Sequence, residues 1–253
     1  MSGLLPDVDP DGLLEFSVVF TDRSLNHMSQ QFQQVMRDIS ATLKQVYKAQ
    51  GVVIVPGGGS YGMEAVARQF ANDQHTLVIR NGWFSYRWSQ ILETGKISPT
   101  STVMKARRIN AEATAPFAPA PIDEVVATIL KEKPKVVFAP HVETSAGIIL
   151  PDEYIRQLGM AAHEVGAILV LDCIASGTIW VDMQDCEVDV LISAPQKGWS
   201  SSPCSALVML SERALKLIET TTSSSFAMDL KKWLQIMQAY ENGGHAYHAT
   251  MPT

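Results

Sequence analysis

Two residues, Asp172 and Lys197, combine a reactive side chain with an unusual place in the sequence. Asp172 directly follows the apolar run 167–171, and Lys197 follows the predicted strand 188–193. A carboxylate at the mouth of a buried strand is partly desolvated and needs a partner. Proline, glycine and tryptophan flank Lys197 nearby, so it does not sit on an ordinary solvated helix face, although a surface-loop lysine is the commonest fate of this residue.

A glycine-rich segment, residues 57–62 with the sequence GGGSYG, follows the apolar run 52–55. Glycines let a backbone approach a phosphate closely, and the start of a following helix attracts anions. A plain tight turn explains the same glycines. A dinucleotide site also has this pattern, but it needs an acidic residue at the end of the second strand, where this chain has only Arg80. A Walker loop is excluded because no lysine follows the glycines.

The chain alternates between short apolar runs and helical periodicity, which predicts a mostly parallel sheet flanked by helices. The predicted strands are 52–55, 76–79, 101–105, 135–139, 167–171, 188–193 and 206–210. The predicted helices are 27–50, 61–72, 85–94, 122–131, 151–165 and one that begins at 211. A polar run over 220–225 marks a surface loop that can precede a hinge or a further subdomain.

The unusual residues share one predicted location. Ligands of open parallel sheets bind outside the carboxyl ends of the strands. Five segments fall at such ends: 57–60, 81–84, 141–145, Asp172 and 196–197. Each is weak alone, and their common position is the informative fact.

These parts together predict a pyridoxal phosphate (PLP) site. That cofactor needs an amine for a Schiff base and an acid beside its ring nitrogen. It also needs a phosphate cradle and an aromatic ring to stack on. In that order the sequence offers Lys197, Asp172, the segment 58–60, and either Trp83 or Phe84.

Composition limits the other classes of function. The chain has 253 residues, of which 46% are hydrophobic and 18% charged, with a net charge of −6. This length allows one large domain with a sizeable core. A mildly acidic chain is a poor polyanion binder, so neither nucleic acid nor a membrane is an expected partner. Three cysteines without a CxxC pair, and an acidic N-terminus broken by prolines, predict a cytoplasmic protein. The HxxH formed by His245 and His248 lacks carboxylates to complete a metal set, so no metal is expected.

The sequence resembles the class V aminotransferases of the alanine–glyoxylate and serine–pyruvate group, which belong to fold type I of the PLP enzymes. The matching segments, in the family's order and spacing, are GGGSYGMEA (57–65), NGWF (81–84), HVETSAG (141–147), LDCIAS (171–176), SAPQK (193–197) and YHAT (247–250).

The resemblance implies roles for individual residues. Gly58, Gly59 and Ser60 hold the phosphate, Phe84 stacks on the ring, Thr144 contacts the ring hydroxyl, Asp172 the ring nitrogen, Ile174 the other ring face, Gln196 the phosphate or ring hydroxyl, and Lys197 carries the cofactor. Tyr247 and Thr250 complete the phosphate site of the neighbouring subunit, so the resemblance also implies a homodimer with shared active sites.

The implied activity is transfer of an amino group from a small amino acid, alanine or serine, to glyoxylate or pyruvate. A lyase or desulfurase of the same fold is an alternative, and an NAD(P)-binding oxidoreductase is the alternative interpretation of the glycine loop. The expected organisation is an N-terminal arm over 1–25 and a PLP-binding large domain over 26–253. The small C-terminal domain, which in relatives supplies a substrate-carboxylate arginine, is expected to be absent from this chain.

Overall fold

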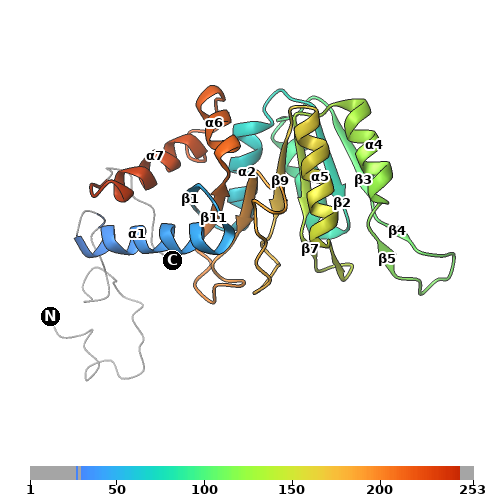
Figure 1. Ribbon diagram of the computed structural model, residues 1–253, viewed down its shortest axis with the longest axis horizontal. Coiled ribbons are helices and arrows are strands. Elements are labelled where there is room, and N and C mark those ends of the chain that lie inside the picture. The colour runs from blue at the N-terminus through green and yellow to red at the C-terminus, as the bar shows by residue number, and fades with distance from the viewer. Residues whose placement is uncertain (1–26, 28–29, 246–253) are drawn as a thin grey trace, which may run out of the picture.

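A seven-stranded sheet forms the centre of the computed structural model, which describes His27 and residues 30–245 (Figure 1). Its strands, in spatial order, are β1 (Gly51–Pro56), β11 (Ser205–Leu210), β10 (Val190–Ser193), β9 (Ile168–Asp172), β6 (Val136–Pro140), β2 (Thr76–Arg80) and β3 (Ser101–Lys105). The predicted α/β class and mostly parallel sheet are confirmed.

The direction of the strands decides where a ligand can bind. β10, β9, β6, β2 and β3 pair in parallel, whereas β11 runs antiparallel to both of its neighbours, β1 and β10. The carboxyl ends of β1 and the parallel strands therefore meet at one edge of the sheet. This edge is where open parallel sheets bind their ligands.

Seven helices accompany the sheet within the described range. They are α1 (Gln30–Tyr47), α2 (Gly59–Phe70), α3 (Trp83–Thr94), α4 (Ile122–Glu132), α5 (Asp152–Glu164), α6 (Glu212–Thr220) and α7 (Leu230–Glu241). α1, α4 and α5 pack on one face, and α1 and α5 lie on the near side in Figure 1. α2, α3 and α6 pack on the other face. None of the helices described is long and apolar enough to span a bilayer.

Alternation along the strands supplies both layers of the core. In β9, Leu169 and Leu171 point to the layer of α5, and Ile168 and Val170 point to the layer of α2. All five residues of β9 are buried. A strand that is covered on both faces has an unbroken run of apolar residues in the sequence. These strands could therefore be predicted from such runs.

Helix α7 was not predicted, and it closes the β1 edge of the sheet. Leu230 and Leu234 join the α2 layer, whereas Ile236, Met237 and Tyr240 join the α1 layer. Tyr240 also meets Phe32 of α1, with 5.6 Å between their ring centroids. The chain after the polar run 220–225 therefore returns to the same core within the described range, and no hinge or further subdomain begins there.

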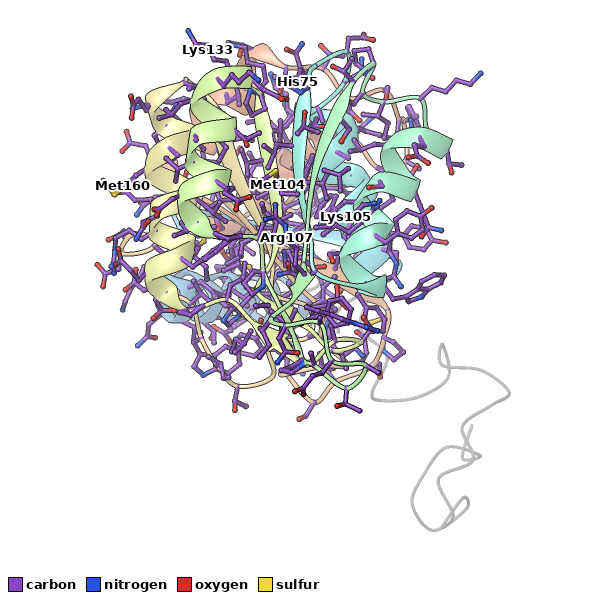
Figure 2. The ribbon with its side chains drawn as sticks, turned by 90° about the vertical axis from the view of Figure 1, so that its right-hand side faces the viewer. His75, Met104, Lys105, Arg107, Lys133 and Met160 are labelled. Carbon is purple, nitrogen blue, oxygen red and sulfur yellow. The ribbon has the colours of Figure 1, made fainter. Side chains whose placement is uncertain are left out.

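The edge strand at the other end of the strand order, β3, has only partly buried or exposed residues. Figure 2 faces this edge and shows Met104 and Lys105 near its centre, with His75 toward the amino ends of the strands. Lys105 is exposed, and charged side chains on an edge strand disfavour pairing with another chain. Two short hairpins were not predicted: β4 (Arg107–Arg108) with β5 (Phe117–Ala118), and β7 (Val142–Glu143) with β8 (Ile148–Ile149).

Candidate active site

Asp172 lies at the carboxyl end of β9, at the bottom of the candidate site. Its backbone oxygen accepts a hydrogen bond from the His141 amide at 2.8 Å, and its Oδ1 accepts one from the Ile174 amide at 2.9 Å. The residue is only 8% exposed. Burial raises the pKa of the Asp172 carboxyl to about 6, although the Ile174 amide and the charge of Arg87 oppose the rise. No ion pair to Asp172 forms within the part of the chain that the structure describes.

The glycine loop joins β1 to α2 and touches the segment after Asp172. Gly57 has a φ of +109°, which favours glycine. A Cβ on Gly59 would lie 2.5 Å from Cδ1 of Ile174, so this glycine permits the close approach of the two segments. A Cβ on Gly58 would meet nothing within 4 Å. Gly58 is also the N-cap of α2 and offers no side chain to its first amides, which leaves them suited to an anion.

Lys197 is exposed on a loop that packs tightly against the turn after Ile174. A Cβ on Gly198 would lie 2.0 Å from the backbone oxygen of Gly177, so the two backbones are in direct contact. The side chain of Trp199 anchors the loop, because its ring lies 6.2 Å from that of Tyr47 and 4.8 Å from that of Trp180. Trp199 therefore packs the lysine loop against Tyr47 and Trp180.

Phe84 and Thr144 complete the rim of the site. Phe84 lies in the first turn of α3 and is 39% exposed. Thr144 is exposed in the turn between β7 and β8, next to the fully buried Glu143. Glu143 accepts hydrogen bonds from the amides of Phe84 and Ser85, so the two segments are held together. Sequence reasoning did not single out Glu143.

The structure thus places the described predicted residues at one edge of the sheet. Asp172, Ile174 and Gly59 are linked through direct contacts, as are Phe84 and the segment carrying Thr144. Lys197 and Gln196 lie on the loop that follows β10. Tyr247 and Thr250 lie outside the described residues, so their predicted roles stay predictions.

The comparisons with known proteins agree with this geometry. A family model described as aminotransferase class-V matches residues 15–246. The chain belongs to the class V aminotransferase family. Its fold is that of PLP fold type I: the crystal structure of an alanine–glyoxylate aminotransferase from Nostoc sp. matches with a TM-score of 0.74 at 20% identity, over 90% of this chain and 58% of that chain.

Two relatives show how far the similarity extends. A Synechococcus sp. protein named soluble hydrogenase, small subunit, is 29% identical over 212 residues, covering 83% of this chain and 53% of that protein. The alanine–glyoxylate aminotransferase of Felis catus is 27% identical over 237 residues, covering 90% of this chain and 53% of that enzyme. The chain therefore spans about half the length of the curated relatives it matches.

Membership of the class V aminotransferases agrees with a topology that does not support the dinucleotide interpretation. A dinucleotide unit joins its glycine loop between two neighbouring parallel strands. Among the described residues, β1 pairs only with the antiparallel β11, and β2 lies far across the sheet. The alternative of an NAD(P) site at residues 57–62 is therefore wrong.

Two other residues of this edge have structural roles. His141 is buried, and its Nδ1 lies 2.7 Å from Oγ of Ser176. Burial lowers the pKa of His141, although the charge of Asp152 opposes this. Cys173 is buried, and burial raises the pKa of its thiol far above the ordinary value. A buried thiol of this kind is a poor nucleophile, as expected of a packing residue.

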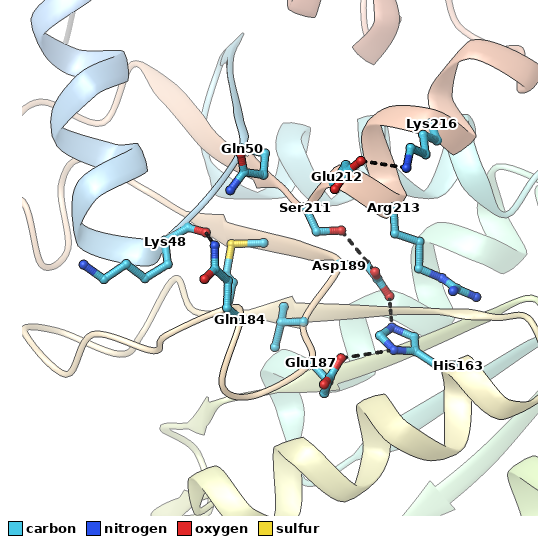
Figure 3. A pocket seen from close by; sticks show the side chains of 12 residues that line it. Lys48, Gln50, His163, Gln184, Glu187, Asp189, Ser211, Glu212, Arg213 and Lys216 are labelled. Atoms are coloured by element: carbon cyan, nitrogen blue, oxygen red, sulfur yellow. Dashed lines mark hydrogen bonds and ion pairs between the residues drawn. The ribbon is translucent and has the colours of Figure 1, made fainter.

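A hollow of about 670 Å³ lies at the amino ends of the parallel strands, on the side of the sheet away from the candidate site (Figure 3). Its deepest polar group, Asp189, accepts hydrogen bonds from the Leu169 amide at 2.9 Å and from Ser211 Oγ at 3.1 Å, and lies 2.8 Å from His163 Nε2. These bonds join α5, β9 and the start of α6. Asp189 is thus fully engaged with His163, Ser211 and the Leu169 amide, which indicates a structural role for this cluster.

Proposed function

We propose that this chain is the cofactor-binding domain of a PLP-dependent aminotransferase. The observation that carries the proposal is Asp172. It is a buried carboxylate without an ion-pair partner among the described residues. It lies on the same side of the sheet as the exposed Lys197. A buried carboxylate needs a nearby positive charge or several hydrogen bonds to be stable as an anion, and the only hydrogen bond to the Asp172 side chain in the described part of the chain comes from the Ile174 amide. A protonated ring nitrogen supplies that charge.

The residues present fit PLP on two further observations. Oε1 of Gln196 is buried and has no hydrogen-bond partner within the described part of the chain, so a polar ligand group would satisfy it. Open space above Gly58 and the uncapped start of α2 together fit a phosphate. The residues that would hold the cofactor are Gly58, Gly59 and Ser60 at the phosphate, Phe84 and Ile174 on the ring faces, Thr144 at the ring hydroxyl, Asp172 at the ring nitrogen, Gln196 near the phosphate or ring hydroxyl, and Lys197 through its amine.

The chemistry divides between cofactor and protein. When bound, PLP supplies an electron sink for the pair of electrons left by removal of an α-proton. Lys197 Nζ would take the proton from the substrate α-carbon as a general base and would deliver a proton back as a general acid. Asp172 would hold a proton on the ring nitrogen, and Phe84 and Ile174 would hold the ring between them.

The substrates we propose are a small amino acid, alanine or serine, and a small oxo acid, glyoxylate or pyruvate. Similar proteins carry the names alanine–glyoxylate and L-aspartate–glyoxylate aminotransferase. The test is a panel of alanine, serine, aspartate and cysteine, each with glyoxylate or pyruvate, followed by detection of both products. Stoichiometric exchange of an amino group supports the proposal. Release of sulfide from cysteine, or elimination without an acceptor, would show the lyase or desulfurase alternative instead.

Two of the three cysteines in the described range, Cys173 and Cys186, are poorly suited to desulfuration, whereas the third, Cys204, is half-buried. A desulfurase passes sulfur to a reactive cysteine thiolate. Cys173 and Cys186 are both buried, and burial raises the pKa of Cys186 to about 11. Such thiols are almost wholly protonated near neutral pH.

A single added methyl group tests the placement of the lysine loop. We expect Gly198→Ala to force the loop away from the Gly177 backbone, because the new Cβ would lie 2.0 Å from that carbonyl oxygen. Overpacking of this kind costs about 1–3 kcal/mol of unfolding free energy. Thermal unfolding and the fraction of Lys197 modified after PLP and borohydride should both fall. The control is Ser202→Ala, an exposed position in the same loop. Equal PLP labelling in both variants would contradict the placement.

We also propose a homodimer with shared active sites. The support is the family resemblance, in which Tyr247 and Thr250 reach the phosphate of the partner subunit. Sedimentation of the PLP-loaded protein tests the dimer. Mixed dimers of Lys197→Ala and Thr250→Ala chains test the sharing, because one intact site would form only if the two residues come from different subunits.

A further inference from the structure

Glu143 is a buried carboxylate at the site that joins its own segment, through Ser145, to Phe84 and Ser85 of a different segment. It ends the short strand β7, is 0% exposed, and receives four of its hydrogen bonds within 3.1 Å. Oε2 accepts from the Ser85 amide at 2.8 Å and from Ser85 Oγ at 2.6 Å. Oε1 accepts from the Phe84 amide at 3.1 Å and from Ser145 Oγ at 2.6 Å.

The same network accounts for every backbone amide in the turn that begins α3. The amides of Asn81 and Gly82 donate to Ser85 Oγ at 2.9 and 3.0 Å. The amide of Trp83 donates to Ser145 Oγ at 2.8 Å. The amides of Phe84 and Ser85 donate to the Glu143 carboxylate. The N-cap of this helix is a glycine without a side chain, so the cap comes from a segment about sixty residues away in the sequence.

Gly82 is the residue that admits this cap. A Cβ at that position would lie 2.4 Å from Ser145 Oγ and 2.8 Å from Cδ of Glu143. The backbone there is extended, with a φ of 174°, so the glycine is required for space and not for its conformation. A side chain at this position would separate the carboxylate from the helix.

The carboxylate is held in its charged form. Burial alone would raise the pKa of Glu143, but hydrogen bonds from Ser145, from Ser85 and from the α3 amides hold that pKa below its ordinary value. The positive end of the α3 dipole acts in the same direction. A charged acceptor at a helix start forms stronger hydrogen bonds than a neutral one.

The two segments that Glu143 joins carry two of the proposed cofactor contacts. Phe84 is in the capped first turn of α3, and Thr144 lies between Glu143 and Ser145. Both of these side chains are exposed. Fixing the carboxylate therefore fixes the relative place of the stacking ring and of the hydroxyl group.

We propose that Glu143 is the positioning residue of this site, and that its buried carboxylate sets where Phe84 and Thr144 meet the cofactor ring. The inference rests on the proposed function, because it takes PLP as the ligand. Glu143 itself touches neither cofactor nor substrate in this account.

The test compares Glu143→Gln with Glu153→Gln. Glu153 is also a carboxylate in the first turn of a helix, α5, but it is exposed and its hydrogen bonds come from Arg156 and Gln157 of its own helix. A glutamine amide at position 143 turns a donor toward at least one α3 amide and removes the charge. Loss of one or two charge-assisted hydrogen bonds corresponds to about 10- to 100-fold in an equilibrium. We expect PLP to dissociate about 10- to 100-fold more readily from Glu143→Gln, and its visible circular dichroism to change. Glu153→Gln should match the wild type.

Two further measurements separate positioning from general stability. In the cofactor-free protein, hydrogen exchange at the Phe84 and Ser85 amides should accelerate in Glu143→Gln, while the amides of β9 stay protected. At saturating PLP, borohydride should still fix the cofactor on Lys197. If Glu143→Gln fails to fold, Ser145→Ala takes its place in the test. This substitution removes only one hydroxyl from an exposed residue, and it should change the same signals in the same direction.

The outcomes also distinguish this inference from the proposed function. Wild-type protein that takes up no PLP would overturn the proposed function and with it the role of Glu143. Wild-type protein that loads normally, together with Glu143→Gln and Ser145→Ala proteins of unchanged PLP affinity and circular dichroism, would overturn the role of Glu143 alone.

Discussion

Replacement of Lys197 by alanine is expected to lower transamination by at least about 10⁴-fold, because the same amine holds the cofactor and moves the proton. Lys197→Arg keeps a positive charge but supplies no nucleophilic amine, so it should be as inactive. Lys131→Ala, at an exposed position on α4, is the matched control and should keep full activity. Initial rates with the best donor and acceptor of the substrate panel measure the effect.

The cofactor content of these variants separates the two roles of the lysine. Lys197→Ala protein should still bind PLP reversibly through the glycine loop and Asp172, and dialysis should remove it. A Lys197→Ala protein with more than a few per cent of wild-type activity would contradict the assignment, because another group would have to move the proton.

Asp172→Asn is expected to reduce turnover by about 10²-fold or more, because an amide cannot balance the charge of a protonated ring nitrogen. The fold should survive, since the two side chains have nearly the same shape and the Ile174 amide can still donate to the side-chain oxygen. PLP labelling on Lys197 should persist. Near-normal turnover with bound PLP would contradict the role of Asp172.

The same substitution should stabilise the cofactor-free protein above neutral pH. Burial raises the folded-state pKa of Asp172 from 3.8 to about 6. A raised carboxyl pKa favours the folded state only while the group is protonated, so this contribution is present below pH 4 and is lost as the pH rises through about 6. The difference amounts to about 1–3 kcal/mol. Asp172→Asn should therefore unfold at a higher temperature than wild type at pH 8, and at nearly the same temperature at pH 4.

Added PLP reverses that order in our account. Wild-type protein at pH 8 should gain stability with PLP, since binding the folded state alone stabilises it. Asp172→Asn should gain less, because its partner for the ring nitrogen has no charge. Identical pH profiles for the two cofactor-free proteins would show that Asp172 is not desolvated in the folded state.

The sheet and its edge were predictable because buried parallel strands leave a clear signal in the sequence. The run 167–171 predicted β9 to within one residue of its bounds, Ile168–Asp172. The strand predicted at 101–105 is β3 without change. Once the strands were placed, parallel topology alone brought Asp172, Lys197 and the glycine loop to a common edge.

Features that depend on distant contacts were not predictable in the same way. Phe84 and Ser85, which donate to Glu143, lie almost sixty residues earlier, and nothing in the segment HVETSAG indicates that these two residues will donate to its carboxylate. The glycine at position 82 indicates a close approach of another segment, but the sequence does not show that this segment carries Glu143 and Ser145. By contrast, α7 left a usable signal, because Leu230, Leu234, Met237 and Tyr240 recur at helical spacing.

Reduction of the PLP-loaded protein with borohydride, followed by peptide mapping, identifies the lysine that carries the cofactor. Borohydride converts the lysine-bound cofactor to a stable secondary amine, so mass spectrometry of the peptides shows which lysine held it. We expect one modified lysine per chain, Lys197, and no stable label in Lys197→Ala. A stable adduct on any other lysine, or no adduct on protein that has been saturated with PLP, would contradict this expectation.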